Sequence, residues 1–234
     1  MKSLQKTFDI LEYVVLRNGE NVTPSRAAEE LGINAVTCTR IMGELVKRGY
    51  LVQVSRKDGY IPGPMLITLN TRHNGYEQLA AAAKDPIRRL SERLRCQVNL
   101  AVMNRGRRIM LCYHHLGGQN LKPWPRFAFA DHWETATGRL LIAQMEEKEA
   151  RKLIHEAGIR PFPGKELEQI RREGWVRFEQ DRLIVIGRCI RIPGSPVAAF
   201  GFGVLPQQER TAMEASAETA AEIVRIVQRP NQAY

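Results

Sequence analysis

Apolar residues near the start of the chain recur at helical spacing. Those on or beside one row are Leu4, Phe8, Leu11, Val14 and Val15. The spacing predicts a first helix with this row as its buried face. Ser3 can cap this helix, and Asn18-Gly19 is expected to end it.

Two more short helices are predicted after it. Thr23 before a proline is typical of a helix start, and Gly32 supplies a left-handed end to a helix over residues 25–31. Asn34 then caps a third helix that runs to about Arg48. The stripe that packs the third helix on the other two is Cys38, Ile41, Met42 and Leu45. Two helices joined by a tight turn with glycine form a helix-turn-helix.

A hairpin follows the third helix and turns the motif into a winged helix-turn-helix. YLVQV and YIP flank the turn SRKDG, in which Asp58-Gly59 is a hairpin signal and Arg56 and Lys57 form a basic tip. In a winged helix the third helix enters the major groove of DNA and the hairpin tip lies near phosphates. The outward side of the third helix holds Val36, Thr37, Thr39, Arg40, Gly43 and Lys47.

Each candidate DNA contact has a plainer alternative. Arg40 is either a solvated helix charge or a DNA contact, and its place opposite the packing stripe favours contact. The two outward threonines either donate to phosphates or cover the helix, and the basic tip either protects the hairpin edge or contacts the DNA backbone. Ser25 and Arg26 begin the second helix, whose N–H groups can hold a phosphate, but plain capping explains them as well.

The rest of the chain mixes strands and helices. Strands are predicted at 97–103, 108–113, 176–178, 183–191 and 197–205, and helices at 138–144, 148–155, 166–172 and 208–227. This pattern predicts an α+β domain over 96–234. A connecting helix over 74–95, interrupted at Pro86, is expected to join it to a DNA-binding domain over 1–73.

Composition and charge restrict the class of protein. The 234 residues are 44% hydrophobic and 26% charged, which is typical of a globular protein, and the net charge is +10. Residues 1–75 hold 10 Lys and Arg against 7 Asp and Glu, so the surplus does not concentrate in the winged helix. Arginines of the connecting helix, such as Arg88 and Arg89, permit extra phosphate contacts or a field that favours an anionic ligand.

No membrane segment is signalled. The longest stretch without a formal charge is short and interrupted by Gly and Pro, and Asp9 and Glu12 break the apolar part of the N-terminal segment. We therefore expect a soluble, cytoplasmic protein with no membrane partner. The four cysteines form no C-x-x-C pair, so we expect reduced thiols.

Signals for a metal or for enzyme chemistry are weak. Metal-ligating side chains gather at Cys112, His114, His115, Asp131 and His132. No second spaced pair completes this cluster, so we expect no metal. Common nucleophile, phosphate-loop, zinc and dinucleotide motifs are absent from the sequence, so we expect no catalytic residues and no cofactor.

Several segments carry a family resemblance through their order and spacing. They are SLQKTFDILEYVV, AAEELGINAVTCTRIMGELVKRGYL, YIPGPMLITL, GRLLIA, and EGW followed by GRCIRIP. Together they resemble the IclR family of bacterial transcription regulators over essentially the whole chain. The resemblance implies a winged helix that binds operator DNA as a dimer. It also implies a GAF-like α/β domain that binds a small effector and assembles into homodimers or homotetramers.

The resemblance also implies particular site residues. Arg40 matches an arginine that the family usually keeps in its DNA-reading helix. Many members have Lys-Ser just before the Thr, where this chain has Ala35-Val36. The apolar Val36 can meet a thymine methyl group, so the operator should differ from those of relatives.

In the effector domain the resemblance implies a second set of residues. They are Thr135, Ala136, Thr137 and Gly138 at a helix start, Glu179 or Asp181, Cys189, and Gly201 on a late strand. Cys189 is either a ligand contact or a packed strand cysteine.

The expected function is that of a sequence-specific transcription regulator. A small effector, with organic or aromatic acids as candidates, would control its affinity for operator DNA. The layout does not fix the sign of regulation, although repression is favoured. The alternative is a metabolite-binding or catalytic α+β protein whose N-terminal helices serve only for dimerisation.

Overall fold

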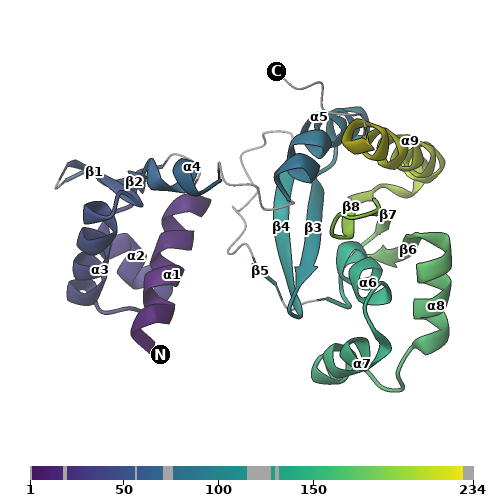
Figure 1. Cartoon of the computed structure of the whole chain (residues 1–234), viewed down its shortest axis with the longest axis horizontal. Helices are drawn as coiled ribbons and strands as arrows, with labels where there is room; N and C mark the ends of the chain where they lie inside the picture. Colours follow the sequence, from purple (N-terminus) through teal and green to yellow (C-terminus); the bar gives the residue numbers. More distant parts are fainter. Residues whose placement is uncertain are drawn as a thin grey trace. The chain divides into compact units, whose positions relative to one another are not determined.

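The computed structural model describes residues 2–17, 20–55, 57–70, 76–114, 128–129 and 132–228. They form two compact units, the first with the elements α1 to α4 and the second with α5 to α9 (Figure 1). Each unit has its own hydrophobic core, and each is described by itself.

The first unit consists of helices and one hairpin. Its elements are α1 (Lys2–Leu16), α2 (Pro24–Leu31), α3 (Ala35–Lys47), β1 (Leu51–Ser55), β2 (Gly59–Pro62) and α4 (Met65–Asn70). The strands pair antiparallel. The first three helices and the hairpin share a core in which Ile10, Val14, Val22 and Met42 are fully buried. This is the winged-helix arrangement that the sequence predicts.

Capping residues set the ends of α2 and α3 as predicted. The side chain of Thr23 accepts a hydrogen bond from a backbone N–H at 3.3 Å, and Gly32 ends α2 in the left-handed conformation. Asn34 accepts from the backbone N–H groups of Val36 and Thr37 at 3.0 and 3.3 Å. The predicted packing stripe of α3 is confirmed, since all four of its residues are buried.

The hairpin depends on a glycine. Gly59 has a φ of +94°, and a Cβ there would lie 2.4 Å from the carbonyl oxygen of Val22. Val22 forms an antiparallel bridge with Tyr60, so the segment before α2 runs beside β2. Only a residue without a side chain permits this close approach.

The predicted buried face of α1 is wrong at its N-terminal end, where Leu4 is 63% exposed and Phe8 is 53% exposed. Of the predicted residues, Val14 is fully buried and Leu11 packs partly buried against the core. The other buried residues of the helix are Ile10, Tyr13 and Leu16. Both sets follow helical spacing, so periodicity alone does not determine which row meets the core. Ser3 lies inside the helix, where its carbonyl accepts from the Thr7 hydroxyl at 3.1 Å, and residues 18–19 lie outside the described residues.

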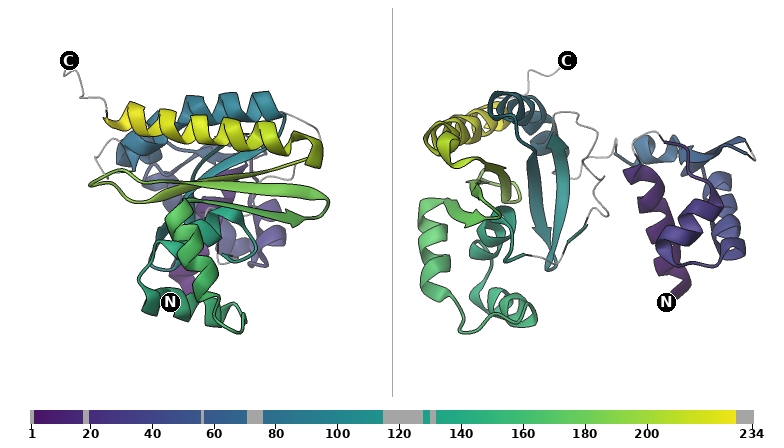
Figure 2. Two further views of the ribbon diagram at one scale, coloured as in Figure 1. Left: turned by 90° about the vertical axis from the view of Figure 1, so that its right-hand side faces the viewer. Right: turned by 180° about the vertical axis from the view of Figure 1, so that it is seen from behind.

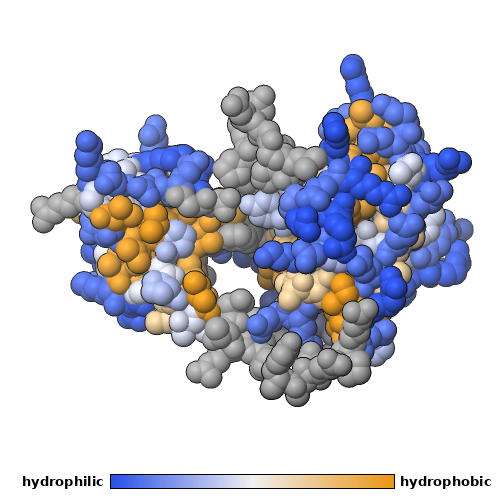
Figure 3. All heavy atoms as spheres, turned by 90° about the horizontal axis from the view of Figure 1, so that it is seen from above, coloured by the Kyte–Doolittle hydropathy of each residue, from blue (hydrophilic) through white to orange (hydrophobic). Residues whose placement is uncertain are grey.

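Other apolar side chains are exposed on the same unit. Those on β1 and α4 are Val52, Val54, Ile67 and Leu69. Figure 3 shows apolar atoms gathered on this unit, on the left of the view. The first unit therefore exposes several large apolar side chains that its own core does not bury.

The second unit is built on an antiparallel sheet. Its strands are β3 (Val98–Asn104), β4 (Arg107–His114), β5 (Ala128–Phe129), β6 (Trp175–Gln180), β7 (Leu183–Ile190) and β8 (Ala198–Val204). Its helices are α5 (Glu77–Leu94), α6 (Ala136–Ala143), α7 (Glu147–Glu156), α8 (Gly164–Glu173) and α9 (Glu209–Gln228), with a 3-10 turn at Pro206–Gln208. The described strands lie in the order β5-β4-β3-β8-β7-β6, which confirms an α+β fold.

Helices cover both faces of this sheet. α5 and α9 lie side by side on one face, and α6, α7 and α8 lie on the other (Figure 2). Between α5, α9 and the sheet is a core in which Leu100, Ile186 and Phe200 are fully buried. None of the described helices is both long and apolar enough to cross a membrane.

The expected break at Pro86 does not occur. α5 is one continuous helix with Pro86 buried inside it. Its packing on α9 and the sheet outweighs the loss of one backbone hydrogen bond. α5 covers most of the range 74–95 that we expected to form a connecting helix, and its buried residues belong to the core of the second unit.

Replacing Asn34 by Ala should destabilise the first unit. The substitution removes the side-chain acceptor of two backbone N–H groups, which costs about 1 kcal/mol of unfolding free energy. Urea unfolding followed by circular dichroism measures the change. Asn34→Asp keeps a capping oxygen and should stay close to the parent. Equal losses in both variants would contradict the capping role.

Candidate DNA-binding face and effector site

The outward face of α3 presents three of the predicted DNA contacts together. Val36 is 77% exposed, and Thr39 and Arg40 are exposed beside it. Thr37 is half-buried at the edge of this face. The Thr39 hydroxyl donates to the carbonyl oxygen of Ala35 at 2.9 Å, which leaves its lone pairs outward.

Arg40 is the cation best placed for an external partner. Within the described part of the chain it makes no ion pair and no side-chain hydrogen bond. Lys47, which we also placed on the outward side, pairs with Glu44 at 2.7 Å. The resulting face combines one apolar side chain, two hydroxyls and one accessible guanidinium.

The start of α2 is engaged within the unit. Ser25 is exposed, but Arg26 forms ion pairs with Glu20 at 3.2 Å and with Glu30 at 3.3 Å. The hydrogen bond with Glu30 is the main reason that the pKa of Arg26 is raised. Glu30 also pairs with Arg17. This network supports the plainer interpretation of Arg26 as a structural residue of the winged helix.

The hairpin tip is organised by Ser55. Its hydroxyl donates to the Asp58 carboxylate at 2.7 Å and accepts from the backbone N–H groups of Lys57 and Asp58. Lys57 is exposed at this tip. Arg56, the other predicted tip contact, lies outside the described residues.

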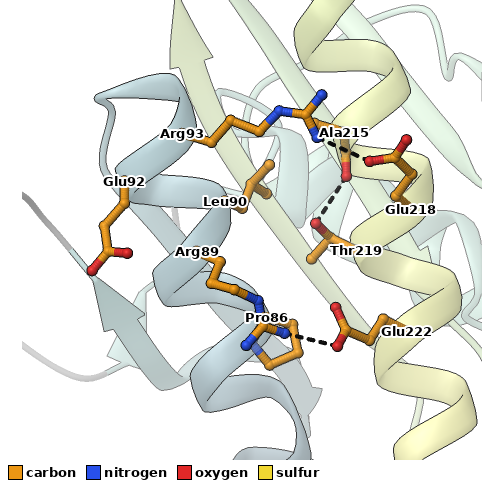
Figure 4. Close-up of a pocket in the computed structure, with 9 residues that line it drawn as sticks. All are labelled: Pro86, Arg89, Leu90, Glu92, Arg93, Ala215, Glu218, Thr219 and Glu222. Atoms are coloured by element: carbon orange, nitrogen blue, oxygen red, sulfur yellow. Dashed lines mark hydrogen bonds and ion pairs between the residues drawn. The ribbon is translucent and has the colours of Figure 1, made fainter.

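The arginines of α5 already have acidic partners. Arg89 pairs with Glu222 at 2.7 Å and Arg93 with Glu218 at 2.9 Å, both across to α9. Figure 4 shows these pairs at a cleft of about 450 Å³ between the two helices. Arg88 pairs with Glu92 along α5. The basic surplus of this helix is thus matched by nearby carboxylates, which weakens the expectation that it contacts phosphates.

The candidate effector site centres on the first turn of α6. The Thr135 hydroxyl accepts from the backbone N–H of Gly138 at 3.2 Å and caps the helix. A Cβ at Gly138 would lie 1.8 Å from the carbonyl oxygen of His132. His132 in turn contacts the carbonyl oxygen of Gly106 at 2.9 Å through Nε2. The helix start is therefore held tightly against the segment before it and the turn between β3 and β4.

The same turn of α6 rests directly on two neighbouring glycines of the sheet. Gly187 on β7 pairs with Gly201 on β8. A Cβ at Gly187 would lie 2.7 Å from the Cβ of Ala136, and one at Gly201 would lie 3.2 Å from it and 3.3 Å from Thr137. The structure thus brings Gly201 together with Ala136 and Thr137 of the predicted helix start. It also shows that Gly201 packs against protein atoms.

Cys189 lies two residues beyond Gly187 and on the same face of β7. It is half-buried, and burial raises the pKa of its thiol to about 11. The side chain is a neutral thiol at neutral pH, which suits packing or a weak polar contact and disfavours nucleophilic chemistry.

The structure separates Glu179 from these residues. The side chains of a strand alternate between faces, and Glu179 pairs in register with Ile184, which lies in the core under α9. Glu179 is exposed and pairs with Arg177 at 3.0 Å. Asp181 lies in the turn after β6 with a φ of +48°. Glu179 therefore lies on the face of the sheet opposite α6, apart from the other residues predicted for the effector site.

Phe178 is the residue that β6 directs toward α6. The guanidinium of Arg139 on α6 lies 4.1 Å from its ring and 5.0 Å from the ring of Trp133. Burial is the main reason that the pKa of Arg139 is lowered. This cation–π contact links α6 to the edge strand β6.

Arg108 is a buried residue that sequence reasoning did not assign to the site. It is 1% exposed on β4, and its Nη1 donates to the Thr137 hydroxyl at 3.2 Å. The sequence places it in a run of basic residues around a turn, which is typical of exposed charges. Its pairing with Met103 and the strand alternation decide its inward direction, and neither can be read from local sequence.

The described residues give no support for a metal site. Among them, no group of three or more His, Cys, Asp or Glu side chains could hold a metal ion. Of the sequence cluster, His115 and Asp131 lie outside the described residues.

The geometry defines a winged helix-turn-helix unit followed by an antiparallel α+β unit, and solved structures share this fold. A crystal structure of an IclR homologue from Microbacterium hydrocarbonoxydans, complexed with 4-hydroxybenzoate, superposes with a TM-score of 0.70 at 17% identity, covering 97% of this chain and 100% of that chain. Pseudomonas aeruginosa HmgR gives a TM-score of 0.68 at 20% identity, covering 96% and 98%. Thermotoga maritima IclR gives 0.61 at 21% identity, covering 97% and 99%.

These likenesses show that the chain has the fold of IclR transcription regulators along nearly its whole length. No protein-family model matches the sequence, and no curated protein matches it. The fold is therefore shared at low sequence identity.

Replacing Gly187 by Ala should displace α6. The new Cβ would meet the Cβ of Ala136 at 2.7 Å and Leu140 at 2.9 Å, so we expect a loss of about 1–3 kcal/mol of unfolding free energy. Thermal unfolding measures it. Gly203→Ala is the control, because the nearest atom there is the end of the Leu183 side chain at 3.2 Å, which can move. Equal stability of the two variants would argue against the close helix contact.

Proposed function

We propose that this chain is an IclR-family transcription regulator. In this proposal its first unit binds operator DNA, its second unit binds a small effector, and the protein works as a homodimer or homotetramer in the cytoplasm. The single observation that carries the proposal is the outward face of α3, which stands on a winged helix shared with solved IclR regulators.

The proposed DNA contacts differ in how accessible their side chains are and in whether they already have partners within the unit. Val36, Thr39 and Arg40 share an exposed face of α3, where Arg40 can bind guanine or phosphate and Val36 can meet a thymine methyl group. Thr37 and Ser25 are proposed as phosphate contacts. The exposed Lys57 would lie near the DNA backbone in the usual winged-helix geometry, with Arg56 beside it. Arg26 is the weakest member because two carboxylates hold it.

The proposed effector is an organic or aromatic acid. Two positive features meet at the start of α6, namely the buried guanidinium of Arg108 and the partial positive charge of the helix N-terminus. Both favour an anion near Thr137. The homologue from Microbacterium hydrocarbonoxydans holds 4-hydroxybenzoate, which makes an aromatic acid a reasonable first probe. Cys189 and Gly201 are proposed to border the site, and Glu179 is not.

Effector binding would act by population shift. A ligand changes DNA affinity only when it binds one arrangement of the paired winged helices better than another. The same layout serves repressors and activators, and repression is our working assumption. No enzymatic role is proposed.

The second candidate is a metabolite-binding or catalytic protein whose N-terminal helices serve only for dimerisation. The exposed apolar residues Leu4 and Phe8 of α1 favour this candidate, because exposed apolar side chains on a helix are typical of an assembly surface. It differs from the first candidate in one measurable respect, because it requires no preference for a DNA sequence.

Replacing Arg40 by Ala should weaken DNA binding. We expect a loss of about 1–3 kcal/mol, roughly ten- to a hundredfold in Kd, for the duplex upstream of the protein's own gene. Fluorescence anisotropy over a range of salt concentrations measures both affinity and salt slope. Arg172→Ala removes the same charge from the exposed surface of α8 and should leave binding unchanged. The regulator proposal fails if the parent prefers its own upstream DNA no more than random duplex and Arg40→Ala changes nothing.

An aromatic acid should stabilise the protein through Arg108. With 4-hydroxybenzoate at about 100 times its Kd, the folded state gains about 2.7 kcal/mol, seen as a rise in Tm. Arg108→Lys should keep part of this rise because it keeps the charge, whereas Arg108→Met should lose it relative to its own ligand-free Tm. Benzoate and a sugar acid test the ligand class. A full rise in Arg108→Met would contradict the anchoring role.

A further inference from the structure

A cavity of about 430 Å³ lies beside α7 in the second unit, and it shares no residue with the candidate effector site. It is formed by the C-terminal part of α7 and by the segment that leads from α7 to α8 (Figure 1). Its charged side chains are the cations Arg151, Lys152 and Arg160 and the carboxylate Glu156. The cavity is therefore electropositive.

Arg160 is the cation of this cavity that no carboxylate neutralises. Its Nη2 lies 2.8 Å from Nε2 of His155, and it makes no ion pair within the part of the chain that the structure describes. Because a guanidinium keeps its protons, Arg160 is the donor in this contact and the neutral imidazole is the acceptor. The contact therefore orients the exposed guanidinium without cancelling its charge.

The other two cations are held differently. Nε of Arg151 donates to Glu147 at 2.7 Å, and its guanidinium lies 4.1 Å from the ring of Phe162. Lys152 lies 3.9 Å from Glu156, which is beyond hydrogen-bond distance, and both side chains are more than half exposed. The flexible stem of a lysine lets it turn to a better partner. Lys152 is thus the second cation that is able to meet an anion in this cavity.

The helix dipole does not cancel this positive charge. The C-terminal end of a helix carries about half a negative charge on its free carbonyl groups. In α7 the last carbonyls already accept hydrogen bonds at 3.0–3.2 Å from the backbone N–H groups of Ala157, Gly158 and Ile159. The lining side chains have a net charge of +2, or +1 when Glu147 is included, so the positive charge is the larger.

The shape of the cavity indicates what kind of anion it suits. A phosphate group has three acceptor oxygens that point in different directions, so donors from two segments of the chain can reach it together. A carboxylate has only two oxygens, and they lie in one plane. The volume is within the range of small-molecule sites, so there is room for an organic part besides the phosphate. Ile159 and Phe162, both half-buried, provide an apolar surface for that part.

We propose that this cavity is a second ligand site that binds a small phosphate monoester. Arg160 and Lys152 hold the phosphate, and Ile159 and Phe162 contact the organic part. The site is separate from the proposed effector site and does not depend on DNA binding.

Calorimetric titration of the full chain with phenyl phosphate, in a phosphate-free buffer of low salt, tests this site. The parent should bind phenyl phosphate more tightly than inorganic phosphate, which lacks the apolar part. Arg160→Met should lower the affinity about tenfold or more, because it removes charged hydrogen bonds. Arg160→Lys should lie between the two, since it keeps the charge and loses the two-pronged geometry. Arg172→Met removes an exposed arginine of α8 outside the cavity and should bind like the parent.

A further variant separates this site from the effector site. Arg108→Met should keep the binding of phenyl phosphate, whereas the binding of benzoate should depend on Arg108 and not on Arg160. Adenosine monophosphate and glucose 6-phosphate then distinguish a flat organic part from a sugar. Circular dichroism checks that each variant is folded.

Three results would overturn the proposal. The first is that the parent does not bind phenyl phosphate. The second is that Arg160→Met binds it as tightly as Arg172→Met does, and the third is that Arg108→Met abolishes its binding. No DNA is present, so failure here leaves the regulator proposal untouched.

Discussion

The second unit depends on the contact between the first turn of α6 and the sheet. Ala136 rests on Gly187 and Gly201, which pair side by side on β7 and β8, and Gly138 lies against the carbonyl oxygen of His132. Three places without a side chain allow a helix start to approach backbone and sheet more closely than a Cβ would permit. The direction of α6 follows from this contact, and with it the place of Thr137 against Arg108. The polar features of the candidate effector site are thus consequences of apolar packing.

In the first unit, α3 carries the proposed DNA contacts, and its buried side and its N-terminal cap determine how it lies. The buried stripe of α3 fixes its rotation about its own axis, and the Asn34 cap fixes where it begins. With both set, Val36, Thr39 and Arg40 can only point outward. The outward face of α3 therefore needs no specific interaction of its own side chains to hold it in place.

Local chemistry explains which features could be predicted from sequence. The ends of α2 and α3, the stripe of α3 and most strands of the second unit follow from capping residues and spacing within a few positions. The predictions that failed concern features that are set by contacts between residues far apart in the sequence. α1 has two apolar rows, and only the tertiary core decides that Ile10 and Val14 face inward while Leu4 and Phe8 do not. The face of Glu179 depends on the turn after β6, and the burial of Arg108 depends on its pairing with Met103. The two-residue strand β5 is too short to carry a periodic signal.

The net charge of +10 is also interpreted differently once the ion-pair partners of the basic residues are known. Arginines of α5, which sequence alone offers to phosphates, are matched by glutamates of α9 and of α5 itself. Exposed pairs of this kind are worth at most about 1 kcal/mol each, so they are not required for stability, but they lower the local positive field. Arg40 has no such partner within the described residues. The proposed role of Arg40 in DNA binding therefore rests on a cation that has no partner among the described residues and lies on a helix face set by apolar packing, more than on the total number of cations.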